Sequence, residues 1–80
     1  MKEIGKIRHF YQKINVAVVE LTDELKQGDE ILIKGKITNL RQKAESMQVE
    51  HKNIAVAKKG ESIGLKVNEP VKENDTVYKV

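Results

Sequence analysis

Side chains that could take part in catalysis are few and widely spaced in this 80-residue chain. His9 and His51 are the only histidines, cysteine is absent, and neither Ser46 nor Ser62 stands in a recognisable nucleophile elbow, the strand-to-helix turn that exposes a catalytic serine. Zinc ligands recur at close spacing, and a serine nucleophile needs a histidine and an acid around it. A Gly-x-x-x-x-Gly-Lys-Ser/Thr phosphate loop is missing as well. We therefore predict a protein that is not an enzyme and holds no metal or cofactor.

The basic residues indicate a different chemistry, the binding of an anionic partner. Lysine and arginine number 15 against 12 acids, which gives a formal net charge of +3. Lysine is a hydrated point charge suited to lying near phosphates, whereas the planar fork of arginine makes bidentate contacts. Only Arg8 and Arg41 could make the second kind of contact.

These basic side chains could form one stripe on a small sheet protein. If Ile7 points inward, Lys6 and Arg8 point outward from the first strand. A stripe of this kind beside the rings of Phe10 and Tyr11 would suit single-stranded or loop RNA. The alternative is that the lysines only solvate the surface and that the two rings close one end of the fold.

Alternating apolar residues predict the strands that must position these side chains. Period two means a strand with one buried face. Ile4 and Ile7 are three apart, so we expect a bulge at Gly5 in a first strand running from about Lys2 to His9. The alternating positions are Ile14, Val16 and Val18, then Ile31 and Ile33, then Ile63, Leu65 and Val67.

One turn pattern occurs three times, each time just before a β-branched residue. Its order is an apolar residue, lysine, any residue, glycine or asparagine, an acid, any residue and a β-branched residue. Glycine and asparagine tolerate a positive φ, so each copy predicts a tight turn that leads into a strand. The copies are Leu25 to Ile31, Ala57 to Ile63, and Val71 to Val77.

The segment from Thr38 to His51 is ambiguous. Leu40, Ala44 and Met47 fall at helical spacing, which leaves a helix as an alternative. The alternation of Met47 and Val49 with polar neighbours favours a half-buried strand.

A chain of this size has room for about six short strands. Closing their sheet into a barrel pairs the backbone groups of the edge strands, so no edge stays exposed. We predict an all-β fold, a single domain over residues 1–80 that forms a small closed six-stranded β-barrel with an aliphatic core.

No stretch approaches the roughly 18 apolar residues of a membrane span, and Met1 to Phe10 lacks the apolar run of a signal peptide. We expect a cytoplasmic monomer that does not bind membranes.

With these strands and turns in place, the sequence resembles the second domain of elongation factor Tu and of other translational GTPases. The resemblance implies the β-barrel of that domain and contact with ribosomal RNA, transfer RNA or the ribosome. It is carried by four segments, which are Ile4 to Ile7, Leu25 to Ile33, Glu45 to His51, and Gly60 to Leu65.

Two positions correspond to the pocket of that family. Gln48 stands where the elongation factors usually have an acid, and its amide can bond a ribose hydroxyl but lacks the charge that favours an α-ammonium group. His51 matches a position that is often basic or histidine in the family.

We therefore predict a noncatalytic, translation elongation factor-like module that contacts RNA through a basic face. An accessory domain that keeps this barrel and binds a protein partner is the alternative, because one fold hosts unrelated functions. The residues expected at the RNA face are Lys6, Arg8, Lys34, Lys36, Arg41, Lys43 and His51.

Overall fold

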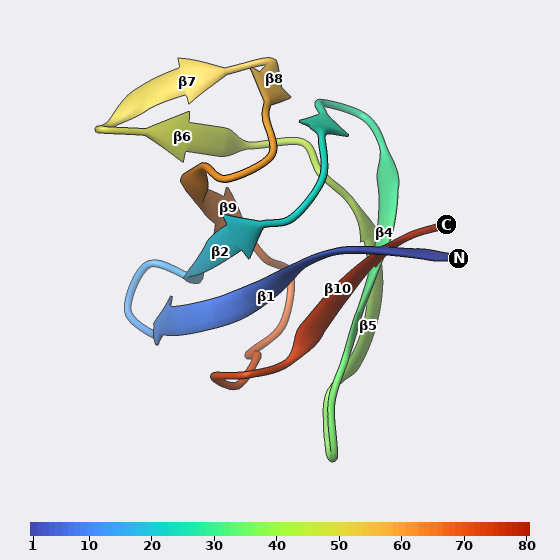
Figure 1. The fold of residues 1–80 in the computed structure, drawn as a ribbon. Coiled ribbons are helices and arrows are strands. Elements are labelled where there is room, and N and C mark those ends of the chain that lie inside the picture. The colour runs from blue at the N-terminus through green and yellow to red at the C-terminus, as the bar shows by residue number, and fades with distance from the viewer.

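The computed structural model describes all 80 residues, and its regular elements are all strands (Figure 1). The all-β prediction is confirmed, and the segment from Thr38 to His51 forms two strands and no helix. The first strand runs two residues beyond the predicted His9. The strands are β1 (Lys2–Tyr11), β2 (Val16–Leu21), β3 (Leu25–Lys26), β4 (Glu30–Lys34), β5 (Asn39–Lys43), β6 (Met47–Val49), β7 (Lys52–Ile54), β8 (Val56–Ala57), β9 (Ser62–Lys66) and β10 (Thr76–Lys79).

Eight strands form one curved antiparallel sheet in the order β5-β4-β10-β1-β2-β9-β6-β7, and β3 pairs with β8 beside it. The sheet is an open half-barrel, so the prediction of a closed six-stranded barrel is wrong. The reason lies between β5 and β6, where the chain leaves the ladder at Ala44 and crosses from one end of the sheet to the other. There the Ala44 N–H donates to the backbone carbonyl of Asp29 at 2.8 Å, and the Lys66 N–H donates to the Ser46 carbonyl at 3.0 Å.

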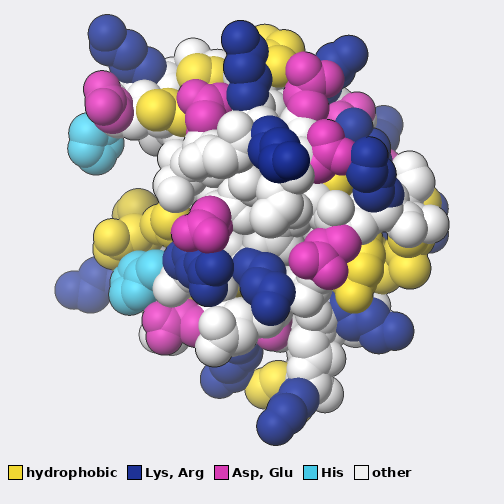
Figure 2. All heavy atoms as spheres, in the orientation of Figure 1, with side chains coloured by type: hydrophobic (Ala, Val, Ile, Leu, Met, Phe, Trp, Pro, Cys, Tyr) yellow, Lys and Arg dark blue, Asp and Glu magenta, His cyan; other side chains and the backbone are white.

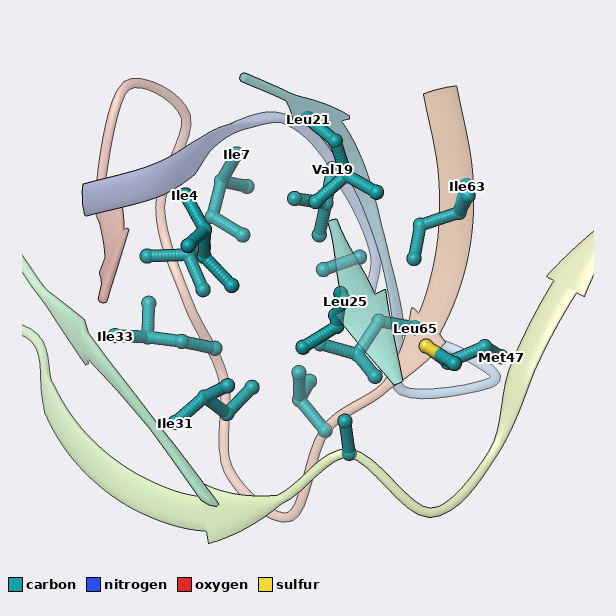
Figure 3. Close-up of a cluster of buried hydrophobic side chains, with 14 of the residues drawn as sticks. Ile4, Ile7, Val19, Leu21, Leu25, Ile31, Ile33, Met47, Ile63 and Leu65 are labelled. Carbon is teal, nitrogen blue, oxygen red and sulfur yellow. The ribbon is translucent and has the colours of Figure 1, made fainter. Parts of the chain in front are cut away.

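The core is aliphatic, as predicted, and contains 17 buried hydrophobic residues. Side chains from β1, β2, β4 and β9 converge in it (Figure 3). Ile4 and Ile7 are both buried, because the register of β1 against β10 shifts between Glu3 and Gly5. Gly5 fits this predicted bulge, since a Cβ there would lie 2.8 Å from the Glu20 carbonyl oxygen.

The buried face of β2 is opposite to the predicted one. Ala17, Val19 and Leu21 are buried, whereas Val16 and Val18 lie on the outer face. Ile14 is exposed over 59% of its surface in the turn before β2. β2 is therefore apolar on both faces, and alternation alone did not reveal which face is covered.

All three predicted turns are present. Gly28, Gly60 and Asn74 have φ values of 93°, 89° and 72°, in the left-handed region that these residue types tolerate. The turns lead into β4, β9 and β10 respectively. The turn chemistry predicted from the sequence is therefore confirmed at each copy.

Candidate functional site: an apolar groove on the outer face

The structure brings some of the basic residues proposed for the RNA face together and separates others from them. Lys6 and Lys34 share one row across the sheet, because both pair in register with Thr76. Lys36 follows in the β4–β5 turn, and Arg41 and Lys43 lie on β5 at one end of the sheet. All of these side chains are exposed.

Both arginines are already engaged with carboxylates. Arg8 donates to Glu20 at 2.9 Å, and Arg41 pairs with Glu30 across neighbouring strands. The hydrogen bond and charge of the Arg8 guanidinium hold the pKa of the Glu20 carboxyl below its usual value. Each pair offsets the charge of one of the two arginines on this surface.

His51 lies far along the sheet order from these residues, in the two-residue turn between β6 and β7. Glu50 and His51 have φ values of 51° and 64°, the conformation of a tight hairpin turn. This turn holds His51 at the rim of a groove of about 430 Å³. Gln48, the other position singled out from the sequence, lines the same groove.

The groove lies on the outer face of the sheet, between the β1–β2 turn and the β6–β7 turn, which project on the same side (Figure 1). Figure 2 shows a hollow on the left of the molecule, with hydrophobic side chains exposed along its lower margin. Tyr11, Ile14, Val16 and Val18 form its apolar side. Half of the surface of Tyr11 is exposed, so this side is open to a ligand.

A glycine lies on the floor of the groove. Val18 and Gln48 both pair in register with Gly64, so the three residues form one row across β2, β9 and β6. Gly64 contributes no side chain to that row and leaves a depression between its neighbours. A Cβ at this position would lie 3.3 Å from Cγ1 of Val16 and would fill part of the depression.

The opposite wall is polar. Nε2 of Gln48 donates to Oδ1 of Asn53 at 3.1 Å, which fixes the amide while its oxygen accepts no hydrogen bond from the protein. A ligand N–H could therefore donate to Gln48 while an apolar side chain occupies the floor. This combination suits a polypeptide segment.

Sequence reasoning found Gln48, His51 and Tyr11 but missed the apolar floor. It predicted Ile14, Val16 and Val18 as core residues because they alternate. The available signal was that β2 carries apolar residues at nearly every position, more than one buried face requires.

No group of three His, Cys, Asp or Glu side chains is placed to hold a metal ion. His9 lies against the ring of Tyr11, with the centroids 4.4 Å apart, and 3.9 Å from a Glu73 oxygen. No helix here has the length and apolar composition of a membrane span.

Comparison with curated proteins gives similarity to proteases, while no family model matches the sequence. The chain is 49% identical over 77 residues to an uncharacterized protease of Methanocaldococcus jannaschii. This matched region covers 95% of this chain and 19% of that protein. It is 35% identical over 78 residues to a collagenase of Porphyromonas gingivalis, covering 95% of this chain and 22% of that protein. The chain thus spans about a fifth of the length of these relatives.

Solved structures agree on the fold. The chain resembles the C-terminal domain of a protein described as a U32 peptidase of Geobacillus thermoleovorans, with a TM-score of 0.91 and 21% identity over 99% of this chain and 92% of that one. The selenomethionine variant of that domain gives a TM-score of 0.93 at 21% identity, with 99% of this chain and 100% of that one covered.

These findings correct the functional prediction. The resemblance to elongation factor Tu and the RNA-binding or ribosome-binding role drawn from it are wrong, because the similar proteins are proteases and a collagenase. The alternative, an elongation-factor barrel that binds a protein partner, is not better supported, because it depends on the same resemblance. The chain is similar in sequence to about a fifth of these proteases, and in fold to the C-terminal domain of a U32 peptidase.

Proposed function

We propose that this chain is a noncatalytic domain that binds polypeptide substrate for a peptidase of the U32 type. Two observations support the peptidase context. Similar sequence forms about a fifth of longer proteins named as a protease and a collagenase, and the same fold forms one domain of a U32 peptidase. The scarcity of catalytic side chains in this chain supports a binding role.

The outer groove is the single observation that carries the binding role. It offers an exposed aromatic ring, Tyr11, an apolar floor around Gly64 and a free amide oxygen on Gln48. Grooves lined by aromatic and apolar side chains bind extended polyproline-type segments, which lose little conformational entropy on binding. The proline-rich single chains of denatured collagen favour this conformation, so they are the ligand class that we assign to the groove.

Titration of the purified chain into fluorescently labelled denatured collagen tests this function. We expect saturable binding, weakened at least about fivefold by Gly64→Ala, because the added methyl group occupies the depression. Ser62→Ala is the matched control, since Ser62 lies on the same strand outside the groove. Absence of saturable binding up to millimolar concentration, or equal binding by a folded Gly64→Ala variant, would refute the proposal.

A further inference from the structure

A second cleft lies at another part of the surface, between the β4–β5 turn and the turn that precedes β10. It has a volume of about 580 Å³, and its walls include Lys34, Lys36, Ile37 and Lys72. Figure 1 shows both turns at the lower end of the molecule. None of its lining residues belongs to the outer groove.

The lysines of this cleft are unpaired. No carboxylate oxygen lies within 4.0 Å of the ammonium groups of Lys34, Lys36 or Lys72, whereas Lys2 and Lys79 have such partners at 2.5 Å and 3.1 Å. A fourth unpaired lysine, Lys6, lies in the cross-strand row that passes through Thr76 to Lys34.

The acids beside these lysines interact with groups other than the lysine ammonium groups. Asp75 is only 5% exposed, and its carboxylate accepts the Lys72 backbone N–H at 2.8 Å. Glu73 is exposed and approaches His9 at 3.9 Å. The cleft thus has three unpaired lysines and a buried Asp75 carboxylate, and Glu73 is the one exposed carboxylate among its lining residues.

The shape of the cleft is fixed by close contact between the two turns. A Cβ at Gly35 would lie 1.9 Å from Oδ1 of Asp75, so only glycine allows this approach. At the rim, Ile37 exposes 77% of its surface to solvent. The cleft thus combines a closely packed base, several positive charges and one apolar side chain at its rim.

We infer that this cleft binds an acidic polypeptide segment, with carboxylates against the lysines and an apolar side chain against Ile37. Charge complementarity decides the sign of the ligand. No aromatic side chain and no arginine lines the cleft, so it lacks the stacking surface and the bidentate donors used for nucleic acids. The inference does not depend on the outer groove being a substrate site.

Fluorescence anisotropy at low salt with a labelled peptide of alternating glutamate and leucine tests the inference. We expect saturable binding that a glutamine analogue of the peptide does not show. The triple substitution Lys34→Gln, Lys36→Gln and Lys72→Gln should weaken it on the order of tenfold. The control removes the same charge elsewhere with Lys52→Gln, Lys58→Gln and Lys59→Gln, and should change affinity less than about twofold.

Three results would overturn the inference. Equal losses in both triple variants would show nonspecific charge attraction. Equal binding of the glutamine peptide would remove the role of carboxylates. Competition by inorganic phosphate or single-stranded RNA at the peptide's own concentration would show a general anion surface. Circular dichroism of both variants confirms that they remain folded.

Discussion

At the scale of single residues, the Gln42 side chain replaces part of a β ladder. Its Nε2 donates to the Lys66 carbonyl at 3.0 Å, and its Oε1 accepts the Asn68 N–H at 2.8 Å. Gln42 is 8% exposed and lies on β5, whereas the two backbone groups belong to β9 and the segment after it. One amide thus links the edge strand β5 to β9, a strand with which β5 does not pair.

Removing this amide should destabilise the fold. Gln42→Ala leaves the Lys66 carbonyl and the Asn68 N–H without their partner, and we expect a loss of about 1 to 3 kcal/mol in the free energy of unfolding. Urea unfolding followed by circular dichroism measures it. Lys43→Ala, an exposed neighbour on the same strand, should change stability by less than about 0.5 kcal/mol. Equal stability of the two variants would show that the amide bridge contributes little.

Such residues are hard to identify from sequence. Gln42 stands between Leu40 and Ala44 in the alternation, so its inward direction follows from the pattern. Its partners lie 24 and 26 residues away, and no local signal names them. The same limit applies to Gly64. In the sequence it is only a glycine that weakens a strand, and its role in the groove follows from its pairing with Val18 and Gln48.

At the scale of elements, three turns repeat one arrangement of hydrogen bonds. The acid carboxylate accepts the lysine backbone N–H in each, at 2.9 Å for Asp29, 2.6 Å for Glu61 and 2.8 Å for Asp75. The acid N–H returns a bond to the lysine carbonyl at 3.0, 3.1 and 3.2 Å. The copies differ in burial, since Asp75 is buried and Glu61 is exposed.

This difference predicts unequal effects of one substitution type. Asp75→Ala should cost about 1 to 3 kcal/mol, because water has little access to the N–H that loses its acceptor. Glu61→Ala should cost less than about 1 kcal/mol, because solvent can replace the carboxylate. Thermal unfolding of both variants in the same buffer compares them. A larger loss for Glu61→Ala would contradict the role assigned to burial.

The elements also show where sequence reasoning succeeds. The turns were predicted correctly because glycine or asparagine and the following acid act within a few residues. The face of β2 was predicted wrongly because Val16 to Leu21 is apolar at five of six positions. The number of strands and the open margins depend on pairing between distant segments, which alternation does not report.

At the scale of the whole molecule, stability should fall in acid. Burial alone would raise the pKa of Asp29, but the Lys26 N–H and the Lys79 ammonium outweigh it and hold that pKa below its usual value. The Lys2 ammonium lowers the pKa of Asp23 in the same way. A lowered pKa stabilises the fold above the unfolded-state value, and this contribution is lost as the pH falls through the folded-state value.

We therefore expect the melting temperature to drop below about pH 4, the ordinary range of aspartate. Asp29→Asn should show a smaller drop between neutral and acid pH than the unmodified chain. Glu69→Gln is the control, because Glu69 is exposed and forms no ion pair. Scanning calorimetry from pH 7 to pH 2 makes the measurement, and an unchanged slope in Asp29→Asn would argue against this source of stability.

The central claim concerns the outer face of the sheet, where we propose that the groove around Gly64 binds extended polypeptide. Nuclear magnetic resonance of the isotope-labelled chain, titrated with a single-stranded proline-rich peptide, tests it most directly. The account predicts progressive, saturable shifts of the amide signals of Tyr11, Val18, Gln48 and Gly64, and their loss in Gly64→Ala. Shifts centred on β4 and β5, or no shifts at millimolar peptide, would contradict it.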